Sequence, residues 1–253
     1  MNQLVLGVLI PVYNEENLLE RMFERLQNTP VPTMPDGTPV ERRVYFINDG
    51  STDGSNAIIS RLGHLEGVQA IHQPSNQGKG SAINVGFMRA INDGCDVLII
   101  QDADMEYDPA EHDAVLAPIL DGRADAVIGT RFLGQTHRVL YYWHSIANRV
   151  ITLFSNMLSN LNLTDIECGY KAFTKEAIKD IRITEDRFGL EPELVAKLAK
   201  AKVEDPETKL YRPLRIYEVP ISYAGRTYQE GKKIGWKDGV EAMWCIVKYN
   251  LFK

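Results

Sequence analysis

Five apolar runs, each followed by a polar turn or a helical pattern, constrain the fold of this 253-residue chain more than any other feature. Runs rich in Val, Ile and Leu are typical of strands buried on both faces. Strands that alternate with helices predict an α/β fold, in which a mostly parallel sheet is covered on both sides. The predicted strands are residues 4–10, 44–47, 68–72, 97–100 and 124–129, and helical spacing follows at residues 18–26, 78–91 and 109–120.

The fourth run, residues 97–100, leads directly into an acidic segment. Asp102, Asp104 and Glu106 alternate with uncharged residues at the carboxyl end of this strand, where open α/β sheets bind ligands. Several carboxylate oxygens close together suit Mg²⁺ or Mn²⁺, especially when a phosphate completes the shell. A structural turn is the alternative, because Asp often ends strands, and Asp108 before a proline predicts a helix start.

The second half of the chain follows a different pattern. Residues 141–160 predict an amphipathic helix whose apolar stripe faces the core rather than a membrane. Residues 191–202 predict another helix, with proline in its first turn, and residues 216–223 a late strand. Residues 224–235 predict a mobile loop, and residues 236–252 a final helix rich in aromatics and flanked by lysines. That helix either lies on an anionic membrane surface or packs on the core.

Charge, cysteine content and the length of the uncharged runs exclude several classes of protein. A net charge of -6 argues against nucleic acid as a partner. The three cysteines, Cys95, Cys168 and Cys245, are far apart and predict neither a disulfide framework nor a zinc site, which favours a reducing, cytoplasmic setting. The N-terminus lacks the pattern of a signal peptide, and the longest uncharged run, residues 150–164, is too short and too polar to span a bilayer.

A glycine-rich turn around Lys79 resembles a phosphate loop but matches neither standard pattern. The Walker pattern requires glycine where Gln73 stands, and the dinucleotide pattern requires glycine where Ile83 stands. Lys79 is expected either to meet a phosphate or a base, or to start a helix whose glycines allow close packing.

Six motifs occur in the order seen in the family 2 glycosyltransferases. Among these enzymes the chain most resembles the dolichyl-phosphate mannosyltransferase and polyprenyl-phosphate glycosyltransferase group, from residue 6 to about residue 249. The resemblance implies a GT-A nucleotide-sugar fold, which is Rossmann-like. It implies a glycosyltransferase domain in residues 1–223, with a donor-binding half (1–130) and an acceptor half (131–223), followed by a loop and an amphipathic helix in residues 224–253. The motifs are residues 11–15, 48–55, 77–80, 101–104, 129–132 and 165–173.

The resemblance also implies a nucleotide-sugar site. Pro11, Tyr13 and Glu15 would line the nucleoside pocket, with Tyr13 against the base and Glu15 towards the ribose. Asp49 occupies the position of the family's base-contacting Asp, and Lys79 would lie near the nucleotide.

The same comparison assigns the acidic segment. Asp102 would face the ribose or the metal, Asp104 would be the main ligand of Mg²⁺ or Mn²⁺, and Glu106 stands where relatives use another polar metal ligand. The cation would neutralise charge on the departing diphosphate while an acceptor attacks the anomeric carbon with inversion.

The acceptor decides which further residues are needed. A polyprenyl phosphate is already an anion, so the site requires cations rather than a base. Arg131 and Arg226 match arginines that hold this phosphate in the group, and Arg suits planar phosphate recognition. Lys232 and Lys233 either assist them or are solvated surface charges.

A hydroxyl acceptor would instead need a carboxylate to take its proton. Asp165, Glu167 and Glu191 are the candidates. The structural alternatives are that Asp165 holds Arg131 or a turn and that Glu191 caps a helix.

Three functions therefore stay open beside a nucleotidyltransferase, whose usual N-terminal glycine-rich loop is absent. The first is hexose transfer from a UDP- or GDP-sugar to a polyprenyl phosphate in the cell envelope, by an enzyme that reaches its lipid peripherally. The second is transfer to a saccharide or protein hydroxyl during surface-polysaccharide assembly. The third is an inactive nucleotide-sugar-binding protein.

Overall fold

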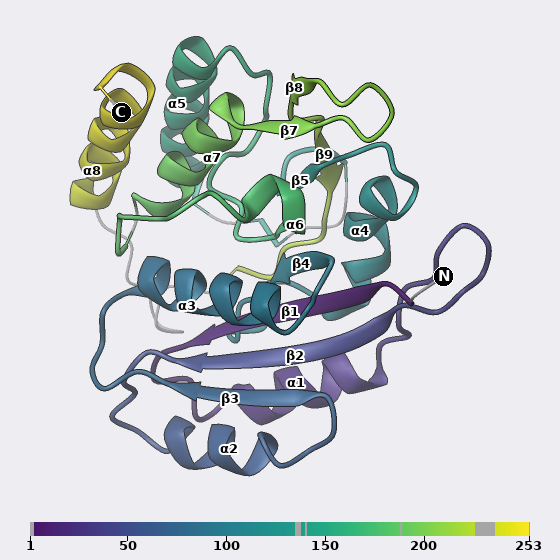
Figure 1. Ribbon diagram of the computed structural model, residues 1–253. Coiled ribbons are helices and arrows are strands. Elements are labelled where there is room, and N and C mark those ends of the chain that lie inside the picture. Colours follow the sequence, from purple (N-terminus) through teal and green to yellow (C-terminus); the bar gives the residue numbers. More distant parts are fainter. Residues whose placement is uncertain (1–2, 135–137, 140, 188, 226–235, 253) are drawn as a thin grey trace.

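Among the described residues, seven strands form one central sheet (Figure 1). The computed structural model describes residues 3–134, 138–139, 141–187, 189–225 and 236–252. The strand order is β3-β2-β1-β4-β6-β5-β9, and β6 is antiparallel to both its neighbours whereas the other pairs are parallel. The predicted mostly parallel sheet is confirmed. The strands are β1 (Val5–Val12), β2 (Glu41–Asn48), β3 (Val68–His72), β4 (Val97–Ile100), β5 (Ala126–Thr130), β6 (Lys171–Thr174) and β9 (Ile216–Pro220).

Helices cover both faces of this sheet because alternate strand residues point to opposite sides. Leu6, Val8 and Ile10 pack with α1, α2 and α4 in one core, whereas Leu9 and Leu98 pack with α3, α6 and α7 in the other. These side chains are all at most 1% exposed. The helices are α1 (Leu19–Asn28), α2 (Ser55–Leu62), α3 (Lys79–Asn92), α4 (His112–Leu120), α6 (Lys175–Ile178) and α7 (Leu190–Lys200).

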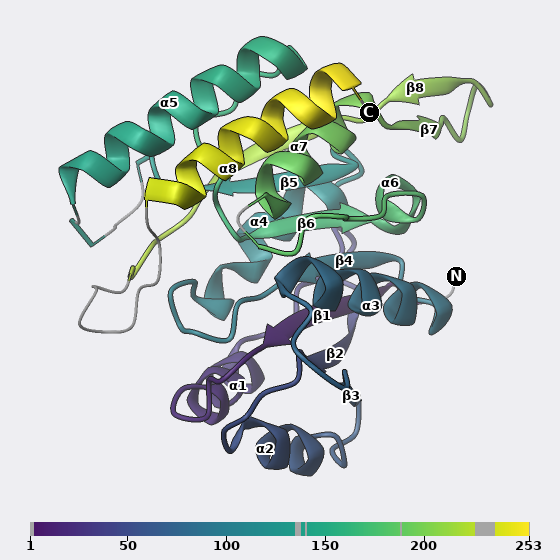
Figure 2. The same ribbon diagram turned by 90° about the vertical axis from the view of Figure 1, so that its left-hand side faces the viewer.

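Two further helices form an outer layer. α5 (Tyr142–Ser159) and α8 (Trp236–Val247) lie side by side over α7, and a π-helical turn (Lys248–Phe252) follows α8 (Figure 2). Ile151, Val195 and Ile246 join the three helices in a small core of their own. In the described part of the chain, no helix combines the length and apolar character needed to cross a lipid bilayer.

Several predicted bounds change because hydrogen bonding, rather than apolarity, ends an element. β1 continues past Pro11 to Val12, since the apolar run extends along β2 in register. The predicted strand 216–223 ends at Pro220, and proline cannot donate a ladder hydrogen bond. The short hairpin of β7 (Lys202–Glu204) and β8 (Tyr211–Pro213) was not predicted, because three residues show no period.

The helix start predicted at Asp108 is confirmed. Asp108 accepts a hydrogen bond from the amide of Ala110 at 3.0 Å, and a 3₁₀ turn (Pro109–Glu111) leads into α4. β6, from the predicted acceptor half, lies between β4 and β5 of the donor half. The two halves therefore share one sheet.

Candidate active site

The carboxyl ends of the parallel strands β1 and β2 meet at one edge of the sheet, and their turns are bonded to each other. The amide of Asn14, which has a φ of 57°, donates to the Ser51 hydroxyl at 3.1 Å, and Asn14 Oδ1 accepts from the amide of Thr52 at 2.8 Å. Glu16 Oε2 accepts from the amide of Gly54 at 2.6 Å. The two turns form one fixed wall at the edge where α/β sheets bind ligands.

The residues predicted to line the nucleoside pocket lie on this wall. Pro11 is half-buried near the end of β1, and Tyr13 follows it with 40% of its surface exposed. Glu15 is fixed through its backbone, whose amide donates to Ser55 Oγ at 3.0 Å. The structure brings the three together at the sheet edge, and their contacts with a nucleoside stay a prediction.

Asp49 holds the turn before α3. It is 3% exposed, and its two oxygens accept from the amides of Gln77 and Gly78, both at 2.8 Å. Burial raises the pKa of Asp49 above its ordinary value, although the two hydrogen bonds act in the opposite direction. A side chain on Gly78 would place its Cβ 2.3 Å from the backbone oxygen of Asp186, so glycine does serve close packing here. The predicted contact between Asp49 and the base stays a prediction.

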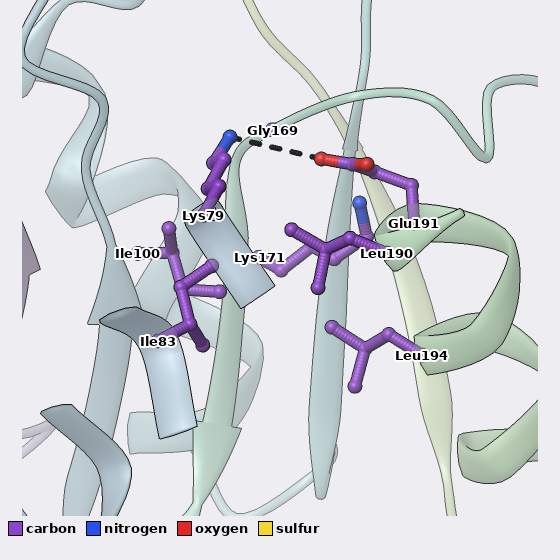
Figure 3. Close-up of a pocket in the computed structure, with 8 residues that line it drawn as sticks. All are labelled: Lys79, Ile83, Ile100, Gly169, Lys171, Leu190, Glu191 and Leu194. Carbon is purple, nitrogen blue, oxygen red and sulfur yellow. Dashed lines mark ion pairs between the residues drawn. The ribbon is translucent and has the colours of Figure 1, made fainter. Parts of the chain in front are cut away.

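Lys79 projects from the start of α3 into a cavity between α3, β4 and α7 (Figure 3). Its Nζ lies 2.8 Å from Asp102 Oδ1 and 3.7 Å from Glu191 Oε1. Burial works against the lysine charge, but the negative charges of Asp102 and Glu191 outweigh it and hold the pKa of Lys79 above its ordinary value. Lys79 is therefore a cation placed beside the acidic segment.

The acidic segment turns sharply after β4. Met105 has a φ of 62°, and Asp104 Oδ1 accepts from the amide of Glu106 at 3.1 Å. The Glu106 carboxylate accepts from the Tyr223 hydroxyl at 2.9 Å, whereas Asp102 faces the lysine described above. Over the described ranges, no three Asp, Glu, His or Cys side chains gather as a metal site. The oxygen donors of Asp102 and Asp104 still suit Mg²⁺ or Mn²⁺ if a diphosphate supplies the remaining ligands.

A buried polar network supports this segment from below. Gln101 Oε1 accepts from the Tyr170 hydroxyl at 2.6 Å and lies 2.9 Å from His112 Nε2. Burial lowers the pKa of His112 to about 3, so its imidazole is neutral. The network fixes Gln101 and thereby helps to fix the backbone of Asp102, the next residue in the chain.

Arg131 and Asp165 form a pair at the end of β5, in which the Asp165 side chain is buried and that of Arg131 is 16% exposed. Arg131 Nε and Nη2 donate to the two Asp165 oxygens at 2.6 and 2.7 Å, and Asn148 adds a third bond at 2.9 Å. Burial favours the neutral acid, but the charge of Arg131 and these bonds outweigh it and hold the pKa of Asp165 below its ordinary value. The alternative in which Asp165 holds Arg131 is thus observed, and an acid of lowered pKa is a weaker base.

Glu167 and Glu191 lie at the other side of this region. Glu167 Oε1 is buried without a hydrogen-bond partner among the described residues. Burial and the negative charge of Glu191 raise the pKa of Glu167 well above its ordinary value. Glu191 lies in the first turn of α7 without capping it, so the capping alternative is not observed.

Three residues that the sequence did not single out belong to the site. Tyr223 contacts Glu106, and Lys171, 1% exposed, donates to the backbone oxygens of Ile166 and Cys168 below the cavity. His112 supports Gln101 from the start of α4. Tyr223 and Glu106 are 117 residues apart, and no sequence spacing rule links positions at that distance. Arg226, Lys232 and Lys233 lie outside the described residues.

Comparison with known proteins identifies the fold and the chemistry. The model of the family described as glycosyl transferase family 2 matches residues 7–182. The chain belongs to this family. The predicted GT-A fold and glycosyltransferase activity are confirmed by this match together with the related sequences and structures.

Several glycosyltransferases of this family are similar over nearly the whole chain. An undecaprenyl-phosphate mannosyltransferase of Micrococcus luteus is 28% identical, over 96% of this chain and 93% of its own length. A polyprenol monophosphomannose synthase of Mycolicibacterium smegmatis is also 28% identical, over 96% and 86%. The solved structure of glucosyl-3-phosphoglycerate synthase from Mycobacterium tuberculosis, with Mn²⁺ and UDP, has a TM-score of 0.68 at 15% identity, over 98% and 80%, and shows the shared fold.

Proposed function

We propose that this glycosyltransferase moves a hexose from a nucleotide sugar to a polyprenyl phosphate, with inversion and with Mg²⁺ or Mn²⁺. The observation that carries the proposal is the Arg131–Asp165 pair beside the acidic segment that follows β4, in which the Asp165 side chain is fully buried and that of Arg131 is 16% exposed. A fixed arginine suits an acceptor that is an anion. The names of the two relatives above, both of which act on polyprenyl phosphates, support the same acceptor.

The donor side follows from the sheet edge. Pro11, Tyr13 and Glu15 would hold the nucleoside, and Lys79 would transfer its charge pairing from Asp102 to the donor diphosphate. This exchange is favourable because a diphosphate carries more charge than a single carboxylate. It would also release Asp102 towards a cation.

The cation site would use Asp102 and Asp104 as protein ligands, with Glu106 at its border. When bound, the cation neutralises the charge that develops on the departing diphosphate. The protein supplies two further effects. Lys79 adds positive charge on the donor side, and the Gln101 network keeps the carboxylates in place before the donor arrives.

The acceptor side needs orientation rather than proton transfer. Asp165 occupies Nε and Nη2 of Arg131, so Nη1 stays outside this pair and can donate to a phosphate oxygen. The phosphate attacks the anomeric carbon through an oxygen that is already charged, and no base is required. Arg226 would be the second phosphate-binding arginine.

Peripheral membrane association is part of this proposal. α5 and α8 lie side by side in the outer layer (Figure 2). Both helices have large apolar side chains that are exposed. Those at the start of α5 follow Arg131 closely in the chain. Trp is favoured where protein meets the lipid headgroups, because its ring is apolar and its NH is polar. The exposed residues are Tyr142, Trp143, Val150, Leu153 and Met157 on α5 and Val240 and Trp244 on α8.

Transfer to a sugar hydroxyl is the second candidate, and one observation favours it. Glu167 has a raised pKa and an oxygen with no partner in the described part of the chain. A carboxylate whose pKa lies nearer to neutrality is a better proton acceptor than an ordinary one. This reaction would use Glu167 or Glu191 as the base.

The test is product detection with the purified protein, Mg²⁺ or Mn²⁺, a panel of UDP- and GDP-sugars and a short polyprenyl phosphate. A glycosylated lipid phosphate is the expected product, identified by mass spectrometry. Donor hydrolysis without that product would move the acceptor to hydroxyls and bring Glu167 forward. No donor turnover with any acceptor would overturn both candidates.

A further inference from the structure

Tyr223 lies between the acidic segment and the Arg131–Asp165 pair, and it contacts both. Its hydroxyl donates to Glu106 Oε2 at 2.9 Å, and the Arg131 guanidinium lies 5.0 Å from the centre of its ring. The ring also packs against Tyr107, with 5.5 Å between ring centres. No other described tyrosine bonds a carboxylate of the acidic segment and packs under the arginine of the acceptor side.

The backbone reinforces the position of this side chain. The amide of Ala224 donates to the Glu106 backbone oxygen at 3.0 Å, and the Tyr223 oxygen accepts from the amide of Arg138 at 2.8 Å. The segment after β9 is therefore tied to the acidic segment on one side and to the chain that follows Arg131 on the other. We expect a shift of the acidic segment, or of the chain that follows Arg131, to move the tyrosine as well.

Both side-chain contacts of Tyr223 involve a charged group, which makes them stronger than contacts between neutral groups. A hydrogen bond to a carboxylate is about twice as strong as one between neutral groups. A guanidinium over an aromatic ring is attracted by the negative face of the ring, more strongly when the pair is shielded from water.

We propose that Tyr223 is a positioning residue that couples the donor and acceptor sites. Its hydroxyl moves with Glu106, to which it is bonded beside the donor and cation. Its ring sets the position of Arg131 beside the acceptor. The inference rests on the proposed function in one respect, namely that Arg131 binds the acceptor phosphate. Binding of donor and cation should then raise acceptor affinity, and the acceptor should raise donor affinity equally.

Removal of the hydroxyl separates the two contacts. Tyr223→Phe keeps the ring under Arg131 but loses the bond to Glu106. The matched control is Tyr217→Phe, which removes a hydroxyl from β9, at a side chain that contacts Arg123 rather than the site. Both substitutions keep an aromatic ring of the same shape and create no large cavity, so we expect both variants to fold.

The experiment is a pair of binding titrations on the full chain. A ten-carbon isoprenyl phosphate is titrated by calorimetry with and without Mn²⁺ and nucleoside diphosphate, and Mn²⁺ is titrated by electron paramagnetic resonance. In the wild type and in Tyr217→Phe, isoprenyl phosphate should bind about 5-fold or more tightly when Mn²⁺ and nucleotide are present, a typical coupling. In Tyr223→Phe this ratio should fall towards 1, while affinity without nucleotide changes less than about twofold.

The outcomes separate the two proposals. A Tyr223→Phe protein with the wild-type ratio would overturn the coupling role, as would a wild type that binds isoprenyl phosphate equally with and without nucleotide. If Arg131→Lys binds isoprenyl phosphate as the wild type does, or the wild type does not bind it, the acceptor assignment fails and the coupling role fails with it. Loss of the ratio in Tyr223→Phe alone supports both.

Discussion

Arg131, which we propose holds the acceptor phosphate, is ordered by its own pairing with a carboxylate. Arg131 is held on two of its nitrogens by a carboxylate that is itself fully buried. Such a pair is costly to form but fixes its geometry, because removal of either partner leaves a buried charge. An arginine fixed in this way would meet an anionic acceptor without first having to be ordered.

Replacement of Arg131 by lysine tests this role without removing the charge. Lysine cannot bond both Asp165 oxygens and a phosphate in one plane. We expect Arg131→Lys to raise the KM for a polyprenyl phosphate about tenfold or more and to change donor affinity less than about twofold, because only one charge-assisted contact is lost. Arg123→Lys, in an exposed pair with Asp121, is the control. Equal losses of donor and acceptor affinity would contradict the assignment.

Asp104 provides the corresponding test on the donor side. Asp104→Asn keeps the size of the side chain but removes the charge that a divalent cation requires. Transfer should fall about a hundredfold or more, and Mn²⁺ affinity measured in the presence of nucleotide should fall with it, as expected for loss of a stabilising charge. Asp121→Asn, at an exposed position, should leave both unchanged. Unaltered Mn²⁺ affinity in Asp104→Asn would exclude this residue as a ligand.

His112 makes the stability of the protein depend on pH. Burial lowers its pKa from 6.5 to about 3, so the unfolded chain binds a proton in this range that the folded chain does not. Stability is therefore complete above pH 6.5 and falls as the pH decreases towards 3, by at most about 1.4 kcal/mol per unit from this group. Urea unfolding of the wild type and of His112→Gln should give a shallower pH dependence in the variant. Parallel curves would show that another group is responsible.

The start of α3 carries Lys79 into the site. The two glycines that flank Lys79 let the loop of residues 183–187 approach closely, and a Cβ at Gly80 would lie 2.0 Å from the backbone oxygen of Glu185. The turn is thus fixed from one side by Asp49 and from the other by this loop. A lysine held on such a turn needs little reorganisation to meet a phosphate.

Gly78→Ala tests the packing at this turn against a matched glycine. Gly78 and Gly94 both have a positive φ, of 92° and 84°, but a Cβ at Gly94 would contact nothing within 4 Å. Both substitutions cost backbone strain of about 1–3 kcal/mol, and Gly78, with a ψ of 159°, lies in a region that almost only glycine adopts. Only Gly78→Ala also displaces a neighbouring backbone. Gly78→Ala should therefore lower the free energy of unfolding more and weaken nucleotide binding. Equal effects of the two substitutions on both quantities would contradict this.

The outer layer of α5 and α8 is the part of the molecule that we propose reaches a lipid. The outer layer of α5 and α8 exposes apolar side chains, whereas monomeric proteins rarely leave such residues together on one surface. The layer lies over α7, on the side of the sheet that contributes Glu191 to the cavity. A membrane bound to this layer would bring the lipid phosphate near the acceptor side.

Vesicle binding tests this surface in the intact protein. Leu153→Ser combined with Trp244→Ser removes two exposed apolar side chains, each of which contributes on the order of 1 kcal/mol or more when buried in lipid. Binding to anionic phospholipid vesicles, measured by sedimentation, should weaken about tenfold while nucleotide binding is unchanged. Leu210→Ser, on the β7–β8 hairpin and 70% exposed, is the control. Vesicle binding unaffected by the double substitution would rule out this surface.

The sequence alone determined the local structure and the family. The apolar runs predicted the strands of the sheet, because burial on both faces requires such runs. The resemblance assigned Pro11, Tyr13, Asp49, Lys79 and the acidic segment to a nucleotide-sugar site, and that assignment stays a prediction. The structure brings these residues together at the carboxyl ends of neighbouring strands, because parallel strands bring their ends to one edge of the sheet.

Only the tertiary structure decided which of these residues meet. The sequence left two roles open for Asp165, a base or a partner of Arg131, and the fold made it that partner by burying its carboxylate against the Arg131 side chain. It also put Tyr223 against Glu106 and left Glu167 with a raised pKa, neither of which a linear spacing predicts. Burial and charge pairing arise between segments far apart in the chain, and their energies depend on distances that only the folded sheet sets.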